Sequence, residues 1–86
     1  MTCRVVWSPF AENWLEHFLS VSADQDTVAA AAKEIDQQLM SDPKGFGESR
    51  DEPVRVGFNR PLGVLFEVLD DVRTVVVYDV WRIDRK

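Results

Sequence analysis

The sequence predicts an α+β domain in the order β-α-α-β-β-β, with a helical hairpin packed on one face of an antiparallel-rich four-stranded sheet. Two stretches with helical periodicity lie in the first half of the 86-residue chain, and alternating apolar segments dominate the second half. A short β-branched segment precedes the helices. Because helices and strands are segregated along the chain, a layered α+β architecture is favoured over alternating strands and helices.

The chain is expected to begin with a short strand over residues 2–7, in which Val5 and Trp7 share one face. Ser8 and Pro9 then end the strand and begin a helix, because serine is a good N-cap and proline is tolerated at the first helical position. The apolar stripe of this helix is formed by Ala11, Trp14, Leu15, Phe18 and Leu19. A stripe this wide predicts that the helix packs on another layer.

A second helix is predicted from about Thr27 to Met40, where residues of high helix propensity form an unbroken run. Its apolar face is narrow and rich in alanine, so it can lie close to the first helix in an antiparallel hairpin. Asp42 and Pro43 end it, because the residue before a proline is driven out of helical geometry. Residues 44–52 are expected to form a polar loop.

Three strands are expected in the remainder of the chain. Residues 53–58 and 62–69 alternate in polarity, and the short link between them is typical of a hairpin. An acidic pair separates them from residues 74–81, a run that is β-branched and aromatic almost throughout. Residues 62–69 carry apolar side chains at both parities, which predicts a strand inside the sheet rather than at its edge.

Strand parity predicts which side chains face the helices. That set is Val54, Val56, Phe58, Leu62, Val64, Phe66, Val68, Val76, Tyr78 and Val80. The opposite face is also apolar, and apolar patches on small monomers commonly mark partner sites. The residues predicted to bind a partner there are Leu65, Leu69, Val75, Val77 and Trp81. A simpler interpretation is that these residues only raise strand propensity.

Length and composition indicate one domain over residues 1–86. No apolar run approaches the roughly 20 residues that span a bilayer, and the N-terminus lacks the features of a signal peptide, so a cytoplasmic location without membrane contact is expected. A single cysteine cannot form an internal disulfide, which fits a reducing compartment. The net charge of −5 counts against tight, non-specific binding of nucleic acid.

No cofactor and no metal ion are expected. Cys3 and His17 are the only cysteine and the only histidine, so no zinc ligand set is available, and both are expected to be packed or surface residues. The loop around Gly45 and Gly47 lacks the lysine-serine ending of a phosphate-binding loop.

The order of these elements and several local signatures resemble the RelE/ParE family of bacterial toxin-antitoxin toxins, also called plasmid-stabilisation proteins. The matching segments are Trp7-Ser8-Pro9, the helical pair ending over residues 39–43, the strand 62–68 and the β-rich close 75–81. The resemblance covers nearly the whole chain and depends on order and spacing. It implies a compact fold whose sheet surface binds a target, and an antitoxin that wraps the toxin and silences it.

The ribonuclease branch of this family implies cationic residues that the chain largely lacks. Gly63 stands where an arginine is common, Val54 and Val56 stand where lysines are common, and Arg82 lies one place from a further expected arginine. The chain ends in Asp-Arg-Lys where a tyrosine or histidine is expected. RNA cleavage through the 2′-hydroxyl needs cations at the phosphate and groups that move protons, so whether the protein is an enzyme stays open.

Three hypotheses follow. The first is a toxin-like component that binds a cellular target, with the ribosome and its mRNA or DNA gyrase as candidates, and is neutralised by an antitoxin. The second is a ribosome-dependent mRNA endoribonuclease with an atypical site, in which the missing cations are replaced by Arg55, Arg60 and Arg82. The third is a non-toxic interaction module that retains the fold. A second copy of the chain could also cover the outer sheet face as a homodimer.

Overall fold

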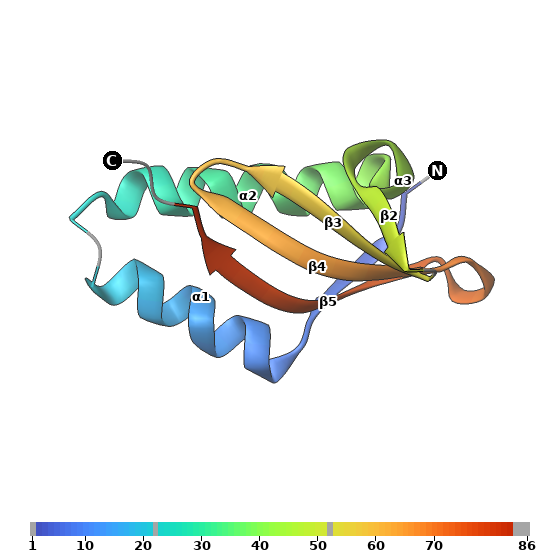
Figure 1. Ribbon diagram of the computed structural model, residues 1–86, viewed down its shortest axis with the longest axis horizontal. Coiled ribbons are helices and arrows are strands. Elements are labelled where there is room, and N and C mark those ends of the chain that lie inside the picture. The colour runs from blue at the N-terminus through green and yellow to red at the C-terminus, as the bar shows by residue number, and fades with distance from the viewer. Residues whose placement is uncertain (1, 22, 52, 84–86) are drawn as a thin grey trace.

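The computed structural model describes residues 2–21, 23–51 and 53–83 and confirms the α+β class (Figure 1). In chain order the elements are β1 (Arg4–Trp7), α1 (Pro9–Val21), α2 (Gln25–Ser41), α3 (Pro43–Phe46), β2 (Glu48–Asp51), β3 (Val54–Asn59), β4 (Leu62–Leu69), the 3-10 turn η1 (Asp70–Val72) and β5 (Thr74–Arg82). Within the described residues, none of the helices combines the length and apolar character needed to cross a membrane.

The strands form one mixed sheet in the order β1-β5-β4-β3-β2. β1 pairs in parallel with β5, and the other neighbours are antiparallel. The four predicted strands are all present, and β2 is an additional edge strand inside the segment expected to be a loop. Its polar composition concealed it from the pattern of apolar residues, because an edge strand can present polar side chains to water.

The two long helices cover one face of the sheet, as the helical hairpin predicts (Figure 1). Between the layers lies a core of fully or almost fully buried side chains: Ala11, Val28, Ala31, Ile35, Leu39, Leu62, Val64, Phe66, Val75, Val77 and Val80. Burial of each large member contributes about 1.5–3 kcal/mol. The core therefore fixes the helices to β4 and β5 and leaves the other face of these strands without a helical cover.

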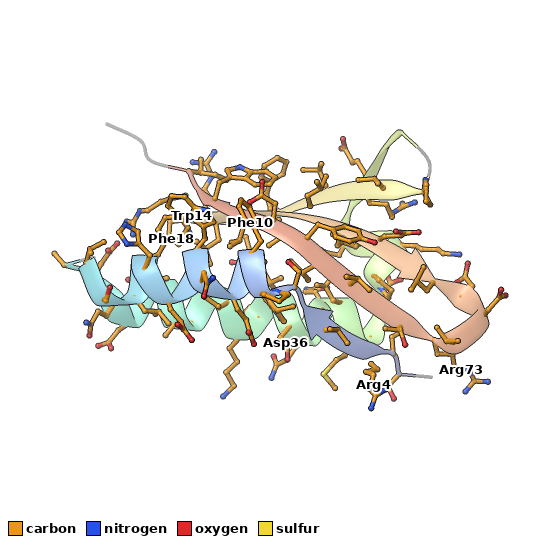
Figure 2. All side chains as sticks on the ribbon, turned by 90° about the horizontal axis from the view of Figure 1, so that it is seen from below. Arg4, Phe10, Trp14, Phe18, Asp36 and Arg73 are labelled. Carbon is orange, nitrogen blue, oxygen red and sulfur yellow. The ribbon has the colours of Figure 1, made fainter. Side chains whose placement is uncertain are left out.

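Aromatic side chains also lie along α1. Figure 2 shows Phe10, Trp14 and Phe18 projecting from the same side of the helix, and the ring centroids of Trp14 and Phe18 are 5.7 Å apart. Trp14 was placed in the apolar stripe, yet it is 42% exposed, and Phe10 is 57% exposed. A separate hydrogen bond links β1 to α2: the indole Nε1 of Trp7 donates to Oδ1 of Asp36 at 3.2 Å.

The predicted parity of β3 is wrong. Gly57 pairs with Val64 and Asn59 with Leu62, and residues paired across a sheet point to the same side. The side chains that reach the face away from the helices are therefore Val54, Val56 and Phe58. The physical reason is the link of two residues between β3 and β4, which pairs odd positions of one strand with even positions of the other.

The predicted parity of β5 is wrong over Val75 to Tyr78 because the strand contains a β-bulge. Leu65 pairs with Asp79 but Phe66 pairs with Val77, so Tyr78 is an extra residue on β5. The bulge reverses the alternation. Val75 and Val77, predicted to bind a partner, are fully buried under the helices, whereas Tyr78 is 40% exposed.

Candidate binding site on the open face of the sheet

We call the side of the sheet away from α1 and α2 the open face. The strand registers place on it Val54, Val56, Phe58, Leu65, Glu67, Leu69, Val76, Tyr78, Asp79 and Trp81. Three of the residues predicted to bind a partner, Leu65, Leu69 and Trp81, therefore lie on this face and are partly exposed. The other two, Val75 and Val77, do not.

Two aromatic rings meet on the open face. The ring centroids of Phe58 and Trp81 are 6.3 Å apart with an interplanar angle of 79°, a favourable edge-to-face arrangement. The Trp81 indole lies on Gly63, where an added Cβ would be 2.7 Å from Cε2 and Nε1 of the indole. Because Gly63 has no side chain, the Trp81 indole can pack directly against it. Where the family resemblance implies an arginine, this chain has a glycine, and the Trp81 indole packs on it.

A hydrogen-bonded pair lies across β4 and β5. The Tyr78 hydroxyl donates to Oε1 of Glu67 at 2.7 Å. This hydrogen bond, helped by partial burial and by the negative charge of Glu67, raises the pKa of Tyr78 above its ordinary value. At neutral pH the tyrosine is therefore protonated, and it presents a polar group between apolar neighbours.

At one end of the open face is a hollow of about 640 Å³, here called the arginine hollow. Its lining residues are Phe58, Arg60, Trp81, Arg82 and Ile83. Arg82 pairs with the core residue Leu62, so its side chain leaves β5 on the helix side, whereas Phe58 and Trp81 lie on the open face, and the hollow lies at the end of the sheet between the two sides. The β3–β4 turn, the end of β5 and the α1–α2 connection all lie at this end of the molecule (Figure 1). Nη2 of Arg82 is 2.9 Å from Oδ2 of Asp24, and this hydrogen bond lowers the pKa of the Asp24 carboxyl.

The structure does not bring the three candidate catalytic arginines together. Arg55 pairs with Phe66 and so lies on the helix side of β3, where its Nη2 donates to the carbonyl oxygens of Lys44 at 3.0 Å and Gly47 at 3.1 Å. It fastens the α3 segment to the sheet. Only Arg60 and Arg82 share the arginine hollow.

The described residues also leave other catalytic features of the ribonuclease branch unassigned. Residues 84–86, where the resemblance implies a tyrosine or histidine, lie outside the description. Among the residues that are described, no three histidine, cysteine or acidic side chains gather as metal ligands would. The open face itself carries apolar and aromatic side chains, with the arginine hollow at one end.

Sequence reasoning assigned five open-face residues to the helix side: Val54, Val56, Phe58, Val76 and Tyr78. For Phe58 the error came from the strand ends: the predicted strands leave a link of three residues, whereas in the structure Asn59 pairs with Leu62 and Phe58 with Gly63. For Tyr78 the alternation of residues 74–81 carried no mark of the bulge.

Comparison with known proteins gives matches among solved structures only. The sequence matches no family model and no curated protein. The toxin-antitoxin complex RelBE2 from Mycobacterium tuberculosis contains a chain that is 19% identical, with a TM-score of 0.78 over 95% of this chain and 92% of that chain. The chromosomal ParDE toxin-antitoxin system of P. aeruginosa gives 16% identity and a TM-score of 0.65 over 96% and 98% of the two chains.

A double arginine-to-alanine mutant of the E. coli toxin RelE in the free state is also similar, at 14% identity and a TM-score of 0.64, over 95% of this chain and 84% of that chain. At these identities the likeness is one of fold. This chain therefore has a RelE/ParE-like toxin fold, as the order and spacing of its segments predicted.

Proposed function

We propose that this protein is the toxin component of a toxin-antitoxin pair, that it acts in the cytoplasm by binding a cellular target through its open face, and that an antitoxin protein neutralises it. The observation that carries the proposal is the open face itself, where Phe58 is 51% and Tyr78 is 40% exposed while the helices cover the opposite side. The fold supports it, because similar chains were solved as parts of the RelBE2 complex and the ParDE system.

Binding is favoured over catalysis by the placement of the polar groups. Arg55 holds backbone carbonyls on the helix side, and Gly63 lies under Trp81, so neither position supplies a cation to the open face. The Tyr78 hydroxyl donates a hydrogen bond to Glu67 that raises the tyrosine pKa, so at neutral pH the phenol stays neutral and is a poor general base. Target recognition then depends on apolar and aromatic contact, with Leu65, Leu69 and Trp81 as contributors.

A second candidate, ribosome-dependent cleavage of mRNA, is favoured by one feature. Arg60 and Arg82 share a hollow with Phe58 and Trp81, and aromatic rings with arginines can stack bases and hold phosphates. In this alternative the two arginines hold the scissile phosphate without Arg55.

The test is inducible expression of the chain alone in a bacterial host. We expect growth arrest by the wild type, loss of arrest by Phe58→Ser, and full arrest by the matched control Phe10→Ser, which makes the same change on α1. Thermal unfolding of both purified variants checks that each is folded. Absence of arrest by the wild type would point to the non-toxic interaction module instead.

Two further measurements separate the candidates. Northern blots during arrest show whether messages stay intact, and intact messages exclude the ribonuclease. Arrest that survives the double change Arg60→Ala and Arg82→Ala excludes it as well. Coexpression of a small protein encoded beside this gene should restore growth if that protein is the antitoxin.

A further inference from the structure

The aspartate at the start of α2 does not cap its own helix. Asp24 occupies the N-cap position, where an aspartate side chain usually accepts a hydrogen bond from a backbone N–H of the first turn. Here the side chain makes no such bond, and only the backbone carbonyl oxygen accepts, from the N–H groups of Thr27 at 3.0 Å and Val28 at 3.1 Å. The carboxylate turns instead to Arg82, 58 residues away in the sequence.

Arg82 is one wall of the arginine hollow. The hollow combines two cations with two aromatic rings, although the chain as a whole carries a net charge of −5. A long polyanion would be repelled by that net charge, whereas a single carboxylate between apolar side chains meets only the local arginines. Asp24 shows that Arg82 binds a carboxylate, with Nη2 of Arg82 donating to Oδ2 of Asp24 at 2.9 Å.

We propose that the arginine hollow docks an acidic-apolar segment of the neutralising partner protein, and that Asp24 occupies Arg82 in the free chain as a built-in competitor for the partner's carboxylate. The inference rests on the proposed function, since it names how the partner is recognised. Phe58 and Trp81 receive the apolar side chains of the segment, and aromatic and arginine residues are the types that anchor protein interfaces.

The exchange has a low cost because Asp24 has an alternative partner in its own helix. When a partner's carboxylate takes Arg82, the freed Asp24 side chain can turn back toward the first-turn N–H groups of α2, at the positive end of the helix dipole. The Asp24 carboxylate thus has two groups that it can pair with, Arg82 and the first-turn N–H groups of α2. A ligand that binds only one of them shifts the population between the two.

The competitor also confers selectivity. A segment without an acidic residue cannot replace Asp24 at Arg82, so it gains only the apolar contacts. A segment that carries the carboxylate gains both, and the difference between the two is the discrimination that the hollow provides.

The experiment measures binding of two blocked peptides, acetyl-Ser-Leu-Glu-Leu-Ser-amide and its Gln analogue, to the purified chain. The indole N–H signal of Trp81 in a proton-nitrogen correlation spectrum reports on the hollow, and Trp81→Phe assigns it. We expect the Glu peptide to shift this signal and to bind more tightly than the Gln peptide. Arg82→Gln should abolish the preference.

Asp24→Asn should tighten binding of the Glu peptide by roughly two- to five-fold, the range set by an exposed ion pair. Asp26→Asn removes the same charge in the first turn of the same helix without removing the carboxylate that binds Arg82, so it should leave the affinity unchanged. Equal affinity for the two peptides, or equal effects of the two Asn variants, would overturn the inference.

A short oligouridylate is titrated in parallel. If it displaces the Glu peptide and binds more tightly, the hollow is a nucleic-acid site and the inference fails. These measurements use the purified chain and no growth assay. A chain that arrests growth yet shows no carboxylate preference therefore loses this inference alone, whereas a chain that shows the preference without causing arrest loses the proposed toxicity alone.

Discussion

Replacing Gly63 with alanine tests the packing of the Trp81 indole on Gly63 at the open face. A Cβ at this position would lie 2.7 Å from two indole atoms of Trp81, inside the 3.4–4 Å of ordinary van der Waals contact. The indole must move away, which disturbs its edge-to-face contact with Phe58. Such overpacking destabilises by about 1–3 kcal/mol.

Whether Gly63→Ala lowers or raises the free energy of unfolding depends on Trp81. In a Trp81→Ala background the clash is gone, and Gly63→Ala should then stabilise the strand by about 0.5–1 kcal/mol, because alanine loses less conformational entropy than glycine on folding. Urea unfolding followed by circular dichroism of the four proteins gives the cycle. A destabilisation of equal size in both backgrounds would refute this packing, because the cost would then come from the backbone.

Three further predictions test other parts of the structure. A titration followed by absorbance at 295 nm should show a pKa above 10 for Tyr78, the only tyrosine, and this pKa should fall toward 10 in Glu67→Gln. The hydrogen bond of the neutral phenol stabilises the fold fully below pH 10, and this stabilisation is lost as the pH rises through the folded-state pKa. An unchanged tyrosine pKa in Glu67→Gln would contradict the hydrogen bond. Urea unfolding should show that Val77→Ala costs about 1–3 kcal/mol and Val76→Ala less than about 1, the reverse of what the predicted parity requires. Arg55→Ala should lower the free energy of unfolding by about 1.5–3 kcal/mol in the same assay, because two carbonyl oxygens lose their charged hydrogen-bond donor. A folded Arg55→Ala chain should remain fully toxic, since Arg55 lies on the helix side.

The order of elements was predictable because local rules determine it. Ser8 and Pro9 begin α1, the alanine-rich run forms α2, and the proline at position 43 ends it, each for a reason visible within a few residues. Which side chains lie on each face of the sheet was harder to predict, because this depends on how the strands pair. The parity of β3 against β4 depends on the length of the link between them, which is three residues with the predicted strand ends and two residues in the structure.

The bulge at Tyr78 could not be predicted from the sequence. Nothing in the alternation of residues 74–81 distinguishes a regular strand from one with an extra residue, because apolar side chains occur at both parities. The bulge became visible only through the unequal pairing of β4 and β5. For the same reason the five residues predicted to bind a partner are divided between the two sides of the sheet: Leu65, Leu69 and Trp81 lie on the open face, while Val75 and Val77 belong to the core.

The glycine at position 63 links the fold to the chemistry proposed for this chain. The family resemblance implies a cation at that point of the central strand, but the glycine there allows Trp81 to lie across β4 and to meet Phe58. The middle of the open face is therefore aromatic, and the cations lie at its end, where Arg60 and Arg82 line the hollow. Such an arrangement suits the proposed binding better than phosphate chemistry, because the cations lie at the end of the face and not at its centre.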